Sequence, residues 1–170
     1  DVGQLTSFRD LRYDPRLNAP FGGLVETPIA EYYQLRSAAV DQTNMQLQSD
    51  TTATTVLTLG AGPTAVDAEL NVTMLNNGVL TLGVACADES TDKCGFSLVL
   101  ELSTTAKAEG AWNITFTVMG RSSTFELLDG ENVLPVRIMT DVSSVEVFAG
   151  FGRGVFSGAM EYFSCMSTPC

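Results

Sequence analysis

Histidine is absent from this chain, and tryptophan occurs once among its 170 residues. Without an imidazole, the sequence offers no Ser-His or Cys-His couple for nucleophilic catalysis and lacks a common zinc ligand. It contains no GxxxxGKS or GxxxxGKT phosphate loop. The closely spaced glycines at positions 150, 152 and 154 belong to a turn between strands and do not precede a helix. We therefore expect neither a metal nor a cofactor.

Basic side chains are also scarce, with nine Lys and Arg against twenty Asp and Glu, for a net charge of −11. A chain this acidic repels phosphate backbones, so we expect no nucleic-acid partner. The simpler explanation of the charge is a solvated surface, not an acidic functional patch. No apolar run approaches the roughly 18–20 residues of a membrane span, so we expect no membrane partner. The start, Asp1-Val2-Gly3, is unlike a signal peptide and indicates a mature or processed form.

The four cysteines form two local pairs, Cys86 with Cys94 and Cys165 with Cys170. A zinc site is the rival explanation, but no CxxC spacing is present. We prefer two short-range disulfides, although four cysteines allow three connectivities. Loops this short remove little entropy from the unfolded chain, so the bridges would fix a loop and a tail.

Two N-x-S/T sequons begin at Asn71 and Asn113. Each lies in an alternating stretch whose apolar residues share one face, which leaves the asparagine on the opposite, solvent-facing side. A glycan is tolerated there. We therefore predict glycosylation at both asparagines and a secreted, vacuolar or other lumenal location.

The chain divides into residues 1–44 and residues 45–170. The first part carries prolines at positions 15, 20 and 28 and reads as a connector that lies on another surface. Within it, Glu26 to Ala38 predicts a short helix, with Thr27 as the N-cap and Pro28 in the first turn.

From about residue 45 onward, short alternating segments are separated by turn signals at intervals of roughly 8–12 residues. This pattern predicts an all-β fold, a two-sheet antiparallel β-sandwich of the jelly-roll or lectin-like kind. The predicted strands are Met45–Leu47, Thr54–Leu59, Val66–Leu75, Val79–Val84, Ser97–Ser103, Trp112–Met119, Ser123–Leu127, Val133–Thr140, Val145–Ala149 and Val155–Tyr162.

The stretch Leu134 to Phe156 predicts consecutive antiparallel hairpins joined by a Gly-rich turn. Sugar hydrolysis by paired carboxylates is the one chemistry to weigh, and Glu146 and Glu161 are candidates by residue type. Glu146 alternates with Val145 and Val147, however, so we expect it on the outer face of a sheet. The sequence identifies no catalytic pair.

Two further features have competing explanations. Trp112 offers a ring for stacking on a sugar, but it shares a strand face with Ile114 and Phe116, which favours core packing. Asp10 and Asp14 are interpreted as structural turn residues.

The segment TDVSSVEVFAGFGRGVFSG (the signature segment, Thr140–Gly158) resembles the closing signature of the C-terminal β-sandwich of glycoside hydrolase family 32, which includes invertases and inulinases. The matching residues are Asp141, Ser144, Val145, Glu146, Phe148, Gly152 and Arg153. The N-terminal stretch Ser7–Ser37 resembles the same family's passage from its last propeller strand through a hairpin into a linker helix. The matching residues there are Arg9, Asp10, Leu11, Leu24, Val25, Pro28, Glu31, Leu35 and Arg36, while Phe8 replaces the usual proline.

The resemblance implies an enzyme whose reacting half is elsewhere. The family hydrolyses fructosyl bonds with retention, using an Asp in a W-M-N-D-P-N-G motif, an Asp in R-D-P and a Glu in E-C, all in an N-terminal β-propeller. None of these motifs occurs in this chain in the family's context. By this resemblance the chain is the C-terminal piece of such an enzyme.

Two hypotheses follow, and an enzyme in its own right would require a carboxylate pair that the sequence does not reveal. In the first, the chain is the non-catalytic subunit of a two-chain β-fructofuranosidase that hydrolyses sucrose or fructans. Apolar residues of the connector would then be buried against the propeller chain: Leu5, Phe8, Leu11, Leu24, Ile29 and Tyr32. In the second, it is a stand-alone lectin-like module that binds carbohydrate or protein.

Overall fold

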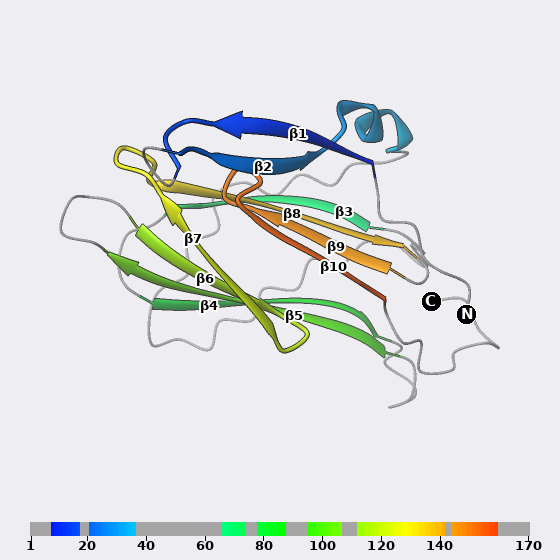
Figure 1. Cartoon of the computed structure of the whole chain (residues 1–170). Helices are drawn as coiled ribbons and strands as arrows, with labels where there is room; N and C mark the ends of the chain where they lie inside the picture. The colour runs from blue at the N-terminus through cyan, green and yellow to red at the C-terminus, as the bar shows by residue number, and fades with distance from the viewer. Residues whose placement is uncertain are drawn as a thin grey trace.

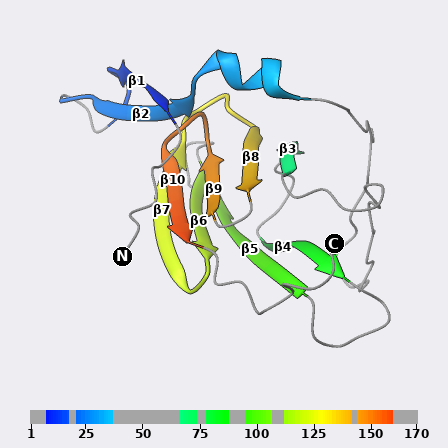
Figure 2. The same cartoon turned by 90° about the vertical axis from the view of Figure 1, so that its right-hand side faces the viewer.

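The computed structural model describes residues 8–17, 21–36, 66–73, 78–87, 95–106, 112–141 and 144–159. These residues form two four-stranded antiparallel sheets that face each other, with a two-stranded hairpin and a short helix lying on the outside of one of them (Figures 1 and 2). The predicted all-β, two-sheet antiparallel sandwich is confirmed.

The sheet beneath the hairpin (the covered sheet) has the strand order β10-β9-β8-β3. Its strands are β3 (Val66–Thr73), β8 (Val133–Asp141), β9 (Ser144–Ala149) and β10 (Gly154–Ala159). The second sheet has the order β4-β5-β6-β7. Its strands are β4 (Gly78–Ala87), β5 (Gly95–Ala106), β6 (Trp112–Val118) and β7 (Arg121–Leu127).

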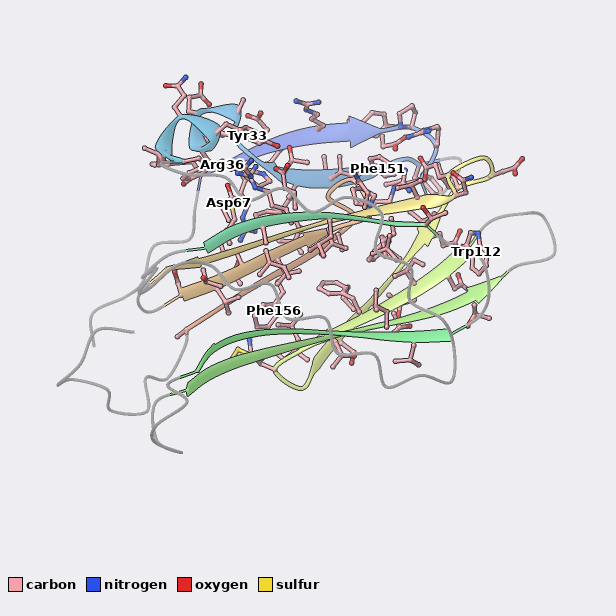
Figure 3. All side chains as sticks on the ribbon, turned by 180° about the vertical axis from the view of Figure 1, so that it is seen from behind. Tyr33, Arg36, Asp67, Trp112, Phe151 and Phe156 are labelled. Atoms are coloured by element: carbon pink, nitrogen blue, oxygen red, sulfur yellow. The ribbon has the colours of Figure 1, made fainter. Side chains whose placement is uncertain are left out.

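Alternation along the strands builds the core between the two sheets. The rings of Phe116 and Phe125 meet edge to face at 6.0 Å, and Phe156 points in from the covered sheet (Figure 3). Trp112 is partly buried and packs against this cluster, so its predicted core role is confirmed. Among the described residues, the largest fully buried side chains are Ile114, Phe116, Val118, Leu127, Leu134, Val136, Ile138, Val145 and Val147.

Each strand from β3 to β10 corresponds to a predicted strand, with small shifts at the ends. The predicted strands Met45–Leu47 and Thr54–Leu59 lie outside the described residues, as do the ends at Leu75 and Tyr162. The boundary between residues 44 and 45 also lies outside them and stays a prediction.

The N-terminal part differs from the prediction. Strand β1 (Arg9–Asp14) pairs with β2 (Gly23–Pro28), and the helix is a 3₁₀ turn limited to Ala30–Leu35. Thr27 is therefore not an N-cap but a strand residue, because β2 finds its main-chain partners on β1. The backbone N–H of Glu26 also donates to the Gly152 carbonyl at 2.9 Å. These tertiary bonds outweigh the local helix signals of Glu26 to Pro28.

Two further predictions concern this hairpin. Asp10 lies in β1 and not in a turn, so that prediction was wrong. Asp14 ends β1, and its side chain accepts from the backbone N–H of Arg16 at 3.0 Å, as expected of a turn residue. The described part of the connector packs on the chain's own covered sheet, and its contact with another chain stays a prediction.

Candidate functional site

The hairpin is held to the covered sheet first by Arg9, whose side chain is largely buried. Its guanidinium lies 2.6 Å from Glu26 and 3.6 Å from Glu146, donates to the Ser157 hydroxyl, and sits 5.4 Å above the Phe148 ring centre. Glu146 is on the outer face of the sheet, as predicted, but it is only 6% exposed. Glu146 is shielded from solvent because Arg9 and the hairpin lie over it.

A second arginine, Arg153, binds the other end of the hairpin. The Arg153 side chain is almost fully buried and contacts both carboxylate oxygens of Glu131, one of them at 2.9 Å. It lies 3.5 Å from Asp14 at the end of β1, and it donates to the Glu126 carbonyl at 3.0 Å. Its guanidinium also lies 5.5 Å from the centre of the Phe151 ring.

The third contact joins the 3₁₀ helix to strands β3 and β8 (Figure 3). Arg36 binds Asp67 at 2.7 Å and Glu69 at 3.0 Å, while Arg137 makes two 2.8 Å hydrogen bonds to Asp67. The guanidiniums of Arg36 and Arg137 lie 4.4 and 4.5 Å from the centre of the Tyr33 ring, and the Tyr33 hydroxyl donates to Glu69 at 2.6 Å. Cation–π attraction therefore adds to the ion pairs.

The arginines keep the carboxylates of the second contact ionised. Hydrogen bonds from Arg16 hold the pKa of Asp14 well below its ordinary value. A hydrogen bond from Arg153 likewise lowers the pKa of Glu131, against a smaller opposing effect of burial. Both side chains therefore act as anions that anchor cations, not as proton donors.

Arginines also lower the pKa of a carboxylate in the third contact. Burial raises the pKa of Asp67, but hydrogen bonds from Arg137 and Arg36 outweigh it and leave that pKa below its ordinary value. The hydrogen bond to Glu69 raises the pKa of Tyr33.

These charge pairs do not have the properties of a hydrolytic pair. A general acid for glycoside cleavage needs a raised pKa, whereas the pKa values of Asp14, Asp67 and Glu131 are lowered. Within the described part of the chain, no group of three or more His, Cys, Asp or Glu side chains is arranged to hold a metal ion. These ion pairs can hold the hairpin on the covered sheet and orient its exposed side chains.

Several large apolar side chains of the hairpin are exposed. Phe8, Leu11 and Leu24 are 77%, 65% and 70% exposed. Tyr13 lies directly opposite Leu24 in the hairpin register and is exposed as well. We call Phe8, Leu11, Tyr13 and Leu24 the apolar row.

The connector residues predicted to be buried only in a complex fall into three groups. Phe8, Leu11 and Leu24 belong to the apolar row, whereas Leu5 lies outside the described residues. Ile29 and Tyr32 are half-buried in the chain itself, and the Tyr32 hydroxyl accepts the backbone N–H of Phe8 at 2.9 Å.

The structure brings most of the signature residues to the hairpin. Glu146 and Phe148 contact Arg9, the Gly152 carbonyl binds Glu26, and Arg153 binds Asp14. The other matching residues lie elsewhere. Val145 is in the core, and Asp141 and Ser144 face each other across the far end of the β8–β9 hairpin.

The predicted modification sites are only partly described. Asn71 is exposed on β3 and Asn113 is half-buried on β6, so the first lies clearly on the solvent side. Cys86 lies in β4, opposite Phe96, while Cys94, Cys165 and Cys170 lie outside the described residues. The two disulfides therefore stay predictions.

Sequence reasoning missed the importance of Asp67, Glu131 and Arg137. An available signal was the unusual arginine at position 137 in an otherwise apolar strand, because a long charge on a sheet face indicates a partner above it. Its partner Asp67 is 70 residues away, so no local pattern reveals the pair.

No protein-family model matches the sequence, and no curated protein matches it either. Among the described residues, no helix has the length and hydropathy needed to cross a membrane.

Proposed function

We propose that this chain is the non-catalytic β-sandwich part of a secreted or vacuolar β-fructofuranosidase, with the reacting carboxylates on a separate propeller chain. Its role is to support and stabilise that chain. The proposal rests on the resemblance of two sequence segments and on their contact in the fold. Arg9 and Glu26 of the N-terminal segment meet Glu146 and Gly152 of the signature segment.

The observation that carries the proposal is the apolar row. Phe8, Leu11, Tyr13 and Leu24 expose large apolar surfaces on a hairpin whose own position is fixed by ion pairs. Exposed apolar surface of this extent is typical of a protein interface, where it is rimmed by polar groups. We infer that the propeller chain covers this surface.

The test is association with the propeller chain. Leu11→Asp combined with Leu24→Asp places two charges in the apolar row, so the partner should no longer co-purify or should bind at least about tenfold more weakly. Val79→Asp is the matched control, because Val79 is equally exposed but lies on β4 of the second sheet. Equal binding by both variants would contradict the proposed interface.

Two measurements test the remaining parts of the proposal. The chain alone should show no hydrolysis of sucrose or inulin, and activity that Glu146→Gln abolished would overturn the non-catalytic assignment. Peptide mapping should find glycan at Asn71 and Asn113 if the chain passes through a lumenal compartment.

The second candidate is a stand-alone lectin-like module that binds carbohydrate or protein. It is favoured by the completeness of the hairpin contacts, since Arg9, Arg153 and Arg36 all find their carboxylates within this chain. A monodisperse 18 kDa monomer from the native source, with an ordered N-terminal hairpin, would decide for this candidate.

A further inference from the structure

A hollow of about 440 Å³ lies between the hairpin and the turn that joins β9 to β10. Arg12, Val25 and Thr27 line it from the hairpin, and Phe151 lines it from the turn. In the hairpin register Arg12 lies opposite Val25, whereas Leu11 and Leu24 occupy the alternate positions. Alternation therefore places Arg12, Val25 and Thr27 on the other strand face from Leu11 and Leu24. Tyr13 of the apolar row also lines the hollow, at its β1 side.

The Phe151 ring is presented to solvent by an unusual backbone. Its φ of 61° is in the left-handed region, which non-glycine residues rarely adopt, and the side chain is 49% exposed. Burial in the core therefore does not explain an aromatic residue at this position. The guanidinium of Arg153, 5.5 Å from the ring centre, helps to hold the ring in place.

The polar groups of the hollow include both donors and acceptors. The Arg12 side chain is 72% exposed, and the ion pair it makes, with Asp10, is long at 3.9 Å, so most of its five N–H donors face solvent. Asp14 also lines the hollow, and its carboxylate accepts three hydrogen bonds from Arg16. Arg153 lies 3.5 Å from the same carboxylate, so Asp14 is already surrounded by cations, and the acceptor that the hairpin offers to a ligand is the Thr27 hydroxyl.

We propose that this hollow binds one neutral sugar ring of a carbohydrate. The apolar face of the ring would stack on Phe151, and its hydroxyls would bind Arg12 and Thr27. Arg12 and Arg16 line the hollow beside Asp14, so an anionic ligand is the alternative that the experiment must separate from a neutral sugar. The volume lies within the range of small-ligand pockets. The site is formed within this chain and does not depend on the proposed propeller partner.

The experiment is a titration of the full chain with sucrose and maltose as neutral probes, followed by NMR shifts or calorimetry. We expect about tenfold weaker binding in Arg12→Ala and in Phe151→Asn. Asn tolerates a positive φ, so the second variant removes the ring without straining the turn. Phe151→Tyr keeps the ring and should retain binding. Arg121→Ala, which removes an exposed arginine from β7, is the matched control.

Three results would overturn the proposal. Sucrose and maltose could fail to bind the unmodified chain. They could bind equally well to Arg12→Ala and Phe151→Asn, which would place the site elsewhere. Glucuronate or inorganic phosphate could bind in an Arg12-dependent way while the neutral sugars do not, which would make the hollow an anion site. Since no propeller chain is needed, each of these results is distinguishable from failure of the proposed function.

Discussion

The outer faces of the two sheets follow the same alternating pattern but meet different surroundings. On the covered sheet, Arg137, Glu146 and Phe148 point away from the core and are nevertheless buried. On the second sheet, hydroxyl side chains of β6 pair across to β7, Thr115 with Thr124 at 3.1 Å and Thr117 with Ser122 at 2.8 Å.

The difference shows what an outward residue reveals about its surroundings. Short hydroxyl pairs suit a face that meets water, where each contributes little to stability. A guanidinium, a carboxylate and an aromatic ring on one outward face indicate a further layer that contacts them. In this fold the layer is the N-terminal hairpin with its 3₁₀ helix (Figure 2).

The largest expected effect is from Arg9→Ala. Removing this guanidinium takes one cation away from the buried carboxylate of Glu146 and from the partly buried one of Glu26. Loss of one partner of a buried ion pair typically lowers the free energy of unfolding by about 3 kcal/mol. Urea unfolding should show this loss, while Arg121→Ala on the second sheet should change stability by less than about 0.5 kcal/mol. Equal losses of unfolding free energy in Arg9→Ala and Arg121→Ala would mean that the contacts on the covered sheet stabilise the fold no more than an exposed residue of the second sheet.

Gly152→Ala should have the next largest effect. Gly152 has a φ of 86°, and an added Cβ would overlap the Glu26 backbone of β2. Gly130→Ala isolates the backbone cost, since Gly130 has a φ of 83° with nothing within 4 Å of the added atom. We expect Gly152→Ala to be less stable than Gly130→Ala by about 2 kcal/mol in the same unfolding experiment. Similar values would show that the turn and the hairpin are not in close contact.

Acid should loosen the covered face before it affects the second sheet. The pKa values of Asp67 and Glu131 are lowered from ordinary values of 3.8 and 4.5. Groups lowered in this way stabilise the folded state fully above their ordinary values, and this stabilisation is lost as pH falls through the lowered values. Hydrogen-exchange protection of the Glu26 amide should therefore be constant above about pH 5 and decline below it.

The control for this prediction is the ladder between β6 and β7. Its protection factors, corrected for the intrinsic pH dependence of exchange, should change less over the same range. A parallel decline of both regions would indicate global unfolding and would contradict a separate effect on the hairpin.

The smallest effect is expected from Thr117→Val on the second sheet. The substitution removes the hydrogen bond to Ser122 but keeps a β-branched side chain in a strand. The free energy of unfolding should change by no more than about 0.5 kcal/mol. A loss as large as that of Arg9→Ala would mean that this face is also covered.

The sandwich could be predicted from the sequence, but the packing of the N-terminal hairpin on the covered sheet could not. Alternation is local, so it located β3 to β10 and placed Trp112 in the core and Glu146 on an outer face. The cover depends on contacts between distant residues, such as Arg9 with Ser157, 148 positions apart. Helix signals at Thr27 and Pro28 were also outweighed by the tertiary hydrogen bond from Glu26 to Gly152.

The candidate site could likewise be predicted only in part. The resemblance drew attention to Glu146, Gly152 and Arg153, but their shared role at the hairpin emerged only from the fold. The wall of Arg12, Thr27 and Phe151 could not be predicted, because the glycines indicate a turn but neither the positive φ of Phe151 nor its approach to the hairpin.

The buried Glu146 has a practical consequence for dissecting this protein. A recombinant sandwich begun at residue 45, where the sequence pattern changes, would lack Arg9 and Arg36 and would leave Glu146 and Phe148 without the residues that cover them. A fragment cut there would expose the Phe148 ring and would remove the Arg9 contact from the Glu146 carboxylate, so it would tend to aggregate. The smallest piece suited to independent expression therefore begins before β1.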